Sequence, residues 1–76
     1  MEQFKINIEQ SIKDIEEDID NMTAYGMKQI VIGFYGGAEN EREFILAARK
    51  AAKARGYECV HEYEDSELLL IIRKVD

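Results

Sequence analysis

Cys59 and His61, the single cysteine and the single histidine of the chain, are the residues best suited to nucleophilic or metal chemistry. They stand two positions apart, so a β-strand would place both side chains on one face as a candidate thiol–imidazole pair. Catalysis would also need a third group to orient the imidazole, and a metal would need more ligands. Glu58 and Glu62 would lie on the opposite face. We therefore predict no catalytic residue, no metal site, and a partly buried Cys59 that acts as a small apolar side chain.

The glycine pair Gly36-Gly37 is a second candidate, because we expect it between a strand and the first turn of a helix. Backbone N–H groups and the helix dipole at such a place attract phosphate. The loop lacks the glycine spacing and the lysine of phosphate-binding motifs, and Glu39 and Glu41 would bring negative charge to the same place. An ordinary turn is favoured over an anion site, and no cofactor is predicted.

Carboxylates are the most frequent ionisable groups, with 16 Asp and Glu residues against 10 Lys and Arg and a net charge of −6. Paired-acid catalysis would need two carboxylates in a cleft with pKa values driven apart. A chain of 76 residues rarely encloses such a cleft. We expect the acids to be exposed and the protein not to be an enzyme.

The acids gather in two segments, a helix expected over residues 8–23 and a hairpin expected over residues 57–72. Such surfaces steer and orient basic partner proteins. The predicted function is a small cytoplasmic protein–protein interaction domain, a regulator, adaptor or inhibitor, that presents them to a basic partner. The candidate partner-binding residues are Asp14, Glu17, Asp18, Asp20, Glu58, Glu62, Glu64, Asp65 and Glu67.

A locally basic segment at residues 41–55 suggests an alternative function, a module that binds nucleic acid such as RNA. Tyr35 and Tyr57 could stack on bases. The candidate nucleic-acid-binding residues are Lys28, Arg42, Arg49, Lys50, Lys53 and Arg55. The overall negative charge opposes an encounter with nucleic acid. We therefore favour pairing of these cations with the acidic segments, within one chain or across a dimer, and rank a small enzyme or metal protein third.

The first helix is predicted by apolar residues at spacings of four and three that share one face. They are Ile8, Ile12, Ile15, Ile19 and Met22. Its start is open. Residues 3–8 alternate with the period of a strand, which favours a short N-terminal strand with Ser11 as the helix cap. Asn7 with Gln10 offers a competing capping box. Gly26 is the expected end of the helix.

Residues 28–35 are rich in β-branched and aromatic side chains and predict a strand. A capping box of Asn40 and Glu43 would start the second helix, and Gly56 would end it. Residues 57–63 alternate as a strand does, and residues 68–72 are continuously apolar, which is typical of a central strand.

The predicted fold is a small α+β sandwich of two or three layers. Its order is β-α-β-α-β-β, or α-β-α-β-β without the N-terminal strand, with a mixed sheet of three or four strands. The right-handed crossover rule makes the strands at 28–35 and 57–63 parallel, and the last strand is expected between them. Two apolar strands imply cover on both faces, from helices on opposite faces or from a partner.

The whole chain, residues 1–76, is predicted to form one compact domain, because 8.8 kDa leaves room for one core. A lone cysteine gives no internal disulfide, so the expected support for so small a core is tight packing of its apolar residues or a second copy of the chain, and a homodimer is predicted. No apolar run is long enough for a membrane span, and residues 1–5 lack the layout of a secretory signal. We therefore expect a cytoplasmic protein with no membrane partner.

Overall fold

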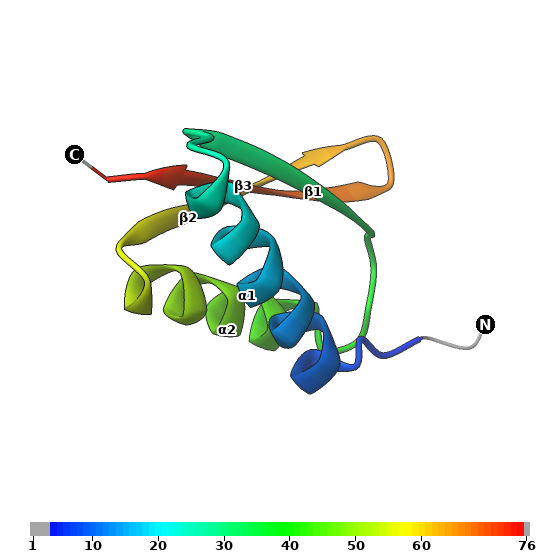
Figure 1. Ribbon diagram of the computed structural model, residues 1–76. Helices are drawn as coiled ribbons and strands as arrows, with labels where there is room; N and C mark the ends of the chain where they lie inside the picture. Colours follow the sequence, from blue (N-terminus) through cyan, green and yellow to red (C-terminus); the bar gives the residue numbers. More distant parts are fainter. Residues whose placement is uncertain (1–3, 76) are drawn as a thin grey trace.

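Residues 4–75, the part that the computed structural model describes, form a small α+β fold of two layers (Figure 1). The elements follow the order α-β-α-β-β. They are α1 (Ile8–Ala24), β1 (Gln29–Tyr35), α2 (Glu41–Ala54), β2 (Tyr57–Glu64) and β3 (Glu67–Lys74). The predicted helices and the three later strands are thus confirmed, in the shorter of the two expected orders.

β3 is the central strand of the sheet, whose order is β1-β3-β2. The prediction that the most apolar strand lies in the middle is confirmed. β3 pairs antiparallel with both neighbours, so β1 and β2 run parallel to each other without touching. Every ladder formed by residues 4–75 is therefore antiparallel, and the expectation of a mixed sheet is corrected. After β2 the chain turns back through a hairpin, so β3 lies between β1 and β2. The two strands that run parallel are therefore kept apart.

Both helices cover the same face of the sheet, and the core lies between the two layers (Figure 1). Leu68, Leu70 and Ile72 of β3 point into this layer and are fully buried. Phe44 of α2 meets Phe34 of β1 edge to face, with ring centroids 4.9 Å apart. The other face, which we call the open face, receives no helix from residues 4–75, so the expectation of helices on opposite faces is wrong, and closure of this face by a partner stays a prediction.

The segment before α1 differs from the expected N-terminal strand. Residues 4–7 are extended but form no strand, and the helix already begins at Ile8 (residue 3 of the prediction lies outside the described residues). The Asn7 side chain accepts a hydrogen bond from the Gln10 N–H at 3.1 Å and caps the helix, so Ser11 is not the cap. The period of two reflects an extended chain that packs Ile6 against the core without a neighbouring strand.

Asn40 holds this extended segment. Its side-chain amide accepts from the Ile6 N–H and donates to the Ile6 C=O, both at 2.8 Å, as a strand residue would. α2 begins directly after Asn40 as predicted, but the capping box with Glu43 is wrong, because the amide is used by a segment 34 positions away. A capping pattern involves only neighbouring residues, so it contains no information on a partner this far away in the chain.

Gly26 and Gly56 end the two helices as predicted. Both have positive φ, 68° and 82°, which costs glycine little. After α1, the Gly26 N–H donates to the Thr23 C=O and the Met27 N–H donates to the Met22 C=O. These two hydrogen bonds together form a Schellman motif.

Candidate functional site

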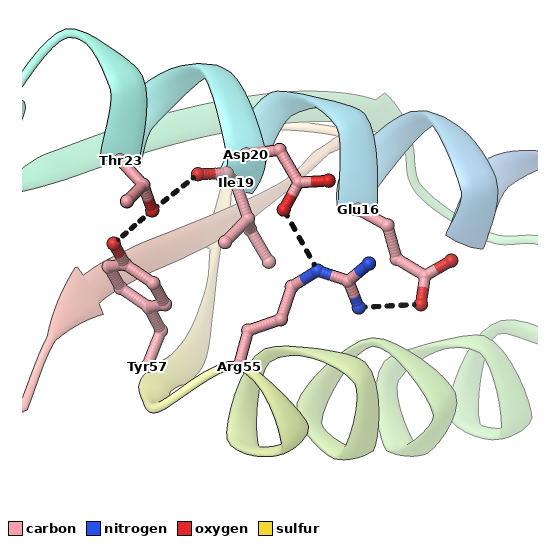
Figure 2. Close-up of polar contacts among 6 residues, drawn as sticks. All are labelled: Glu16, Ile19, Asp20, Thr23, Arg55 and Tyr57. Atoms are coloured by element: carbon pink, nitrogen blue, oxygen red, sulfur yellow. Dashed lines mark hydrogen bonds and ion pairs between the residues drawn. The ribbon is translucent and has the colours of Figure 1, made fainter.

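The acids of α1 divide between two flanks of the helix. Glu16 and Asp20 face α2, where the Arg55 guanidinium donates to Glu16 at 2.9 Å and to Asp20 at 3.1 Å (Figure 2). The hydrogen bond to Asp20 raises the pKa of Arg55. One candidate partner-binding acid, Asp20, and one candidate nucleic-acid-binding cation, Arg55, are therefore joined to each other. In the same view Thr23 bonds to the hydroxyl of Tyr57.

Asp14 and Asp18 lie on the other flank of α1. Each is two positions from Glu16, and two positions turn a helix by about 200°, so these carboxylates point away from α2. Both are exposed, and so is Glu17. Because α2 packs against β2, the flank opposite α2 lies on the β1 side of the molecule.

The acids of the β2–β3 hairpin lie on the open face. Strand alternation directs Glu58, Glu62 and Glu64 of β2 to this face, together with Glu67 of β3. Glu58 forms an ion pair with Arg73 at 2.8 Å. Glu64 and Glu67 stand directly opposite each other in the register, and Asp65 follows in the turn with φ of 56°. The structure thus brings four exposed acids together at the turn: Glu62, Glu64, Asp65 and Glu67.

The remaining basic candidates do not form one surface. Lys28 stands before β1, at the end of the sheet far from the hairpin turn. Arg42, Arg49, Lys50 and Lys53 are exposed on α2. Arg42 and Arg49 line a groove between α2 and the end of β2, together with His61 and Tyr63.

Cys59 and His61 share the helix-facing side of β2, as their spacing predicts. Cys59 is buried, and burial raises the pKa of its thiol. The His61 Nδ1 lies 3.2 Å from the Arg49 guanidinium, and its ring packs edge-on to Tyr63. The raised pKa disfavours the reactive thiolate, and the His61 imidazole contacts the Arg49 guanidinium rather than the Cys59 thiol.

At the turn Gly36-Gly37, the carboxylate of Glu41 in α2 occupies the place where an anion would bind. The Gly37 N–H donates to the Glu41 side chain at 2.7 Å. The Tyr63 hydroxyl donates to the same carboxylate, and this hydrogen bond raises the pKa of Tyr63. Glu41 therefore ties the turn to β2.

The outer edge of β1 is a feature that the reasoning from sequence missed. Lys74 N–H donates to Lys28 C=O, and Gly36 N–H to Ser66 C=O, at the two ends of the β1–β3 ladder. Bonded pairs alternate along an antiparallel ladder, so the even-numbered residues of β1 bond to β3. The N–H and C=O groups of Gln29, Val31, Gly33 and Tyr35 point outward, and no other strand within residues 4–75 pairs with them. The uncharged sequence QIVIGFY is the signal that could have revealed this edge.

The side chains of β1 are also the least covered of the sheet. Ile30, Ile32 and Phe34 face the helices but are only half-buried, whereas the three core residues of β3 are fully buried. On the open face, Val31 is 54% exposed. Apolar surface therefore continues around this edge from one face to the other.

Among residues 4–75, no three His, Cys, Asp or Glu side chains are grouped so that they could hold a metal ion. Neither helix in this range is long and apolar enough to cross a membrane.

Comparison with known proteins gives no relative. The chain matches no protein-family model, no curated protein and no solved structure.

Proposed function

We propose that the protein is a non-catalytic interaction domain, a regulator, adaptor or inhibitor, that binds a basic partner protein through its acidic surfaces. The observation that carries this proposal is the group of acids at the hairpin turn. Glu64 and Glu67 stand directly opposite each other, and Glu62 and Asp65 add charge of the same sign. Like charges in opposed positions destabilise a strand pair. A basic partner would relieve this repulsion, which gives the arrangement a use.

The exposed acids Asp14, Glu17 and Asp18 of α1 support the same function. These acids are exposed, and the ion pairs present among residues 4–75 do not include them. Charges of this kind raise the rate of encounter and orient the partner more than they strengthen the final complex. Binding should therefore weaken as salt is added.

The test compares two variants that lose the same charge. Glu62→Gln, Glu64→Gln and Glu67→Gln are combined in one variant. Glu9→Gln, Glu39→Gln and Glu43→Gln are combined in the control, since these exposed acids lie outside the proposed surfaces. Proteins captured from an extract of the host are identified, and the association of a captured basic protein is measured at low and high salt. We expect the first variant, and not the control, to slow association and reduce its salt dependence. Equal behaviour of both variants would remove the surface assignment.

A cytoplasmic location suits this function. A reducing compartment keeps a single cysteine as a thiol, and Cys59 is unpaired and buried within the fold.

Self-association is a second part of the proposal. Val31, Val60, Leu69 and Ile71 form an apolar patch in the middle of the open face, and the sheet register places Val31, Ile71 and Val60 in one row. Contiguous apolar patches of this kind mark interaction sites. A second copy stacked on this face would complete the missing layer as a homodimer.

Nucleic-acid binding through α2 is the other candidate, and the groove lined by Arg42, Arg49 and Tyr63 is the observation that favours it. Cations would contact phosphates and the tyrosine would stack on a base. Titration of labelled single-stranded RNA at two salt concentrations tests it. Binding that falls with salt and is lost in Arg42→Gln with Arg49→Gln would support this function, and no binding at low salt would remove it.

A further inference from the structure

We propose that the outer edge of β1 accepts an extended segment of a basic partner protein as a fourth strand of the sheet. This inference rests on the proposed function for the basic character of the partner, and it adds the place and the mode of binding. In such strand addition, backbone hydrogen bonds supply affinity and alternate side chains supply specificity.

The backbone of this edge is ready for pairing. Lys28 and Gly36 hydrogen-bond to β3, and bonded positions alternate along the strand between them. The N–H and C=O groups of Val31, Gly33 and the other odd-numbered residues of β1 therefore point outward. A strand placed beside β1 would meet these groups in the spacing of an ordinary ladder. It would also cover Ile30, Ile32 and Phe34, whose helix-facing side chains are left half-buried.

The opposite edge of the sheet is protected, and β1 is not. Natural proteins place charges on exposed edge strands to prevent pairing. β2 carries three acids along its length, Glu58, Glu62 and Glu64, and Asp65 follows directly in the turn, whereas Gln29–Tyr35 carries no charge at all. The chain therefore discourages pairing at one edge and leaves the other open to it.

Acids flank the β1 edge on both faces of the sheet. Asp14 and Asp18 lie on the flank of α1 that faces the β1 side. On the open face the Glu67 carboxylate lies directly over Gly33, so closely that a Cβ there would collide with it. Whichever way its side chains alternate, an added strand would present residues to one of these groups of acids. Lysine or arginine at those positions would be attracted.

The same charges argue against a second copy of this chain at the edge. Antiparallel pairing of β1 with itself would bring the two α1 flanks together, with Asp14 and Asp18 facing their own copies. Like charges of this kind disfavour the encounter. A basic segment from another protein is favoured at the same place by the same acids.

A synthetic peptide of seven residues, the length of β1, provides the probe. It alternates lysine with valine and has blocked ends and a fluorescent label. We expect saturable binding by fluorescence anisotropy that weakens with salt, and changes in the backbone NMR signals of residues 29–35. A matched peptide with an N-methyl group on every residue should lose affinity about tenfold or more, because it cannot donate backbone hydrogen bonds to β1 in either alternation.

Val31→Pro tests the edge in the protein itself. The Val31 N–H points outward, so proline removes a donor for the peptide without removing a bond to β3, and edge strands tolerate proline in this position. His61→Pro is the matched control, because β2 bonds to β3 through its even-numbered residues and the His61 N–H points out at the other edge. Both variants are checked for folding by circular dichroism. Peptide affinity should fall about tenfold or more in Val31→Pro, and stay within about twofold in the control.

Other results would overturn the proposal. Equal binding of the N-methylated peptide, equal binding by Val31→Pro, or NMR changes centred on β2 would each place the peptide elsewhere. A homodimer that Val31→Pro converts to a monomer, while Ile71→Lys on the open face leaves it intact, would show that the edge belongs to a second copy. If the hairpin variant loses its native partner while Val31→Pro keeps it, the edge proposal fails and the proposed function stands. If only Val31→Pro loses binding of the native partner, the edge proposal is supported and the assignment of the hairpin acids to partner binding is wrong.

Discussion

Cys59 illustrates how burial decides the use of a side chain. Its thiol points into the layer between sheet and helices, and desolvation raises its pKa above the ordinary value of 9.0, with a smaller opposing effect from Arg49. Only the thiolate is a strong nucleophile. The residue that appears most reactive in the sequence therefore serves as part of the core.

The reaction of Cys59 with iodoacetamide should be slow, and its rate should rise with pH to a midpoint above 9.0. Mass spectrometry of the alkylated protein follows the rate, and the urea-unfolded chain is the control with a midpoint near the ordinary value. Because the folded pKa is raised, the folded state favours the protonated thiol. Its contribution to stability is complete below the unfolded pKa and is lost as pH rises through the folded pKa. A midpoint at or below that of the unfolded chain would contradict the burial.

Gly36 and Gly33 should respond differently to alanine. At Gly36 a Cβ would lie 2.8 Å from the backbone carbonyl of Ser66, which cannot move without disturbing the hairpin. Overpacking of this kind costs about 1–3 kcal/mol in the free energy of unfolding. At Gly33 the colliding atom is the end of the flexible Glu67 side chain, so Gly33→Ala should change stability by about 0.5 kcal/mol or less. Urea denaturation of both variants measures the difference, and equal effects would contradict the assigned close approach.

Asn40 shows how one loop residue organises the elements around it. It precedes α2, and it holds the chain that leads into α1 by two hydrogen bonds to Ile6. The backbone adds a third link, from the Glu39 N–H to the Phe4 C=O at 2.9 Å. The starts of both helices are thus joined at one end of the molecule, while Arg55, at the end of α2, is joined to the middle and second half of α1 through Glu16 and Asp20.

Asn40→Ala should lower the free energy of unfolding by about 1–3 kcal/mol, because two partly buried backbone groups of Ile6 lose their partner. Hydrogen exchange at the Ile6 amide should accelerate in the same variant. Asn7→Ala is the control, since loss of this helix cap should cost about 1 kcal/mol and leave the Ile6 amide protected. Unchanged exchange at Ile6 in Asn40→Ala would show that the side-chain contact is unimportant.

The whole molecule has two layers where a fully covered sheet would have three. Both helices lie on one face, and the other face keeps an apolar centre between the Glu58–Arg73 ion pair and the acids of the hairpin turn. The open face and the β1 edge are contiguous, since Val31 belongs to both. A partner could therefore use either surface without displacing a helix.

A dimer through the open face should double the 8.8 kDa mass of one chain in light scattering at high protein concentration. Ile71→Lys should restore the monomer, because it places a charge in the apolar centre of the interface. Lys53→Glu, on exposed α2, is a control that should leave the mass unchanged. A monomer at every concentration would remove the proposed dimer and leave the β1 edge unaffected.

Local patterns were enough to predict most of the elements and the central strand. The spacing of Ile8 to Met22, the stops at Gly26 and Gly56, and the apolar run at residues 68–72 act over a few neighbouring residues. Such patterns can be recognised without knowing what lies across the fold. The acids of the hairpin could also be located, because strand alternation assigns them to one face.

Tertiary structure decided which groups meet. The Asn40 amide hydrogen-bonds to Ile6 rather than to its own helix, and Arg55 pairs with two of the acids on α1. Both helices lie on one face of the sheet. These outcomes depend on contacts between residues far apart in the chain, where several partners of suitable chemistry compete and packing selects one. The exposed β1 edge has the same origin, because a strand becomes an edge only when the others have taken their places.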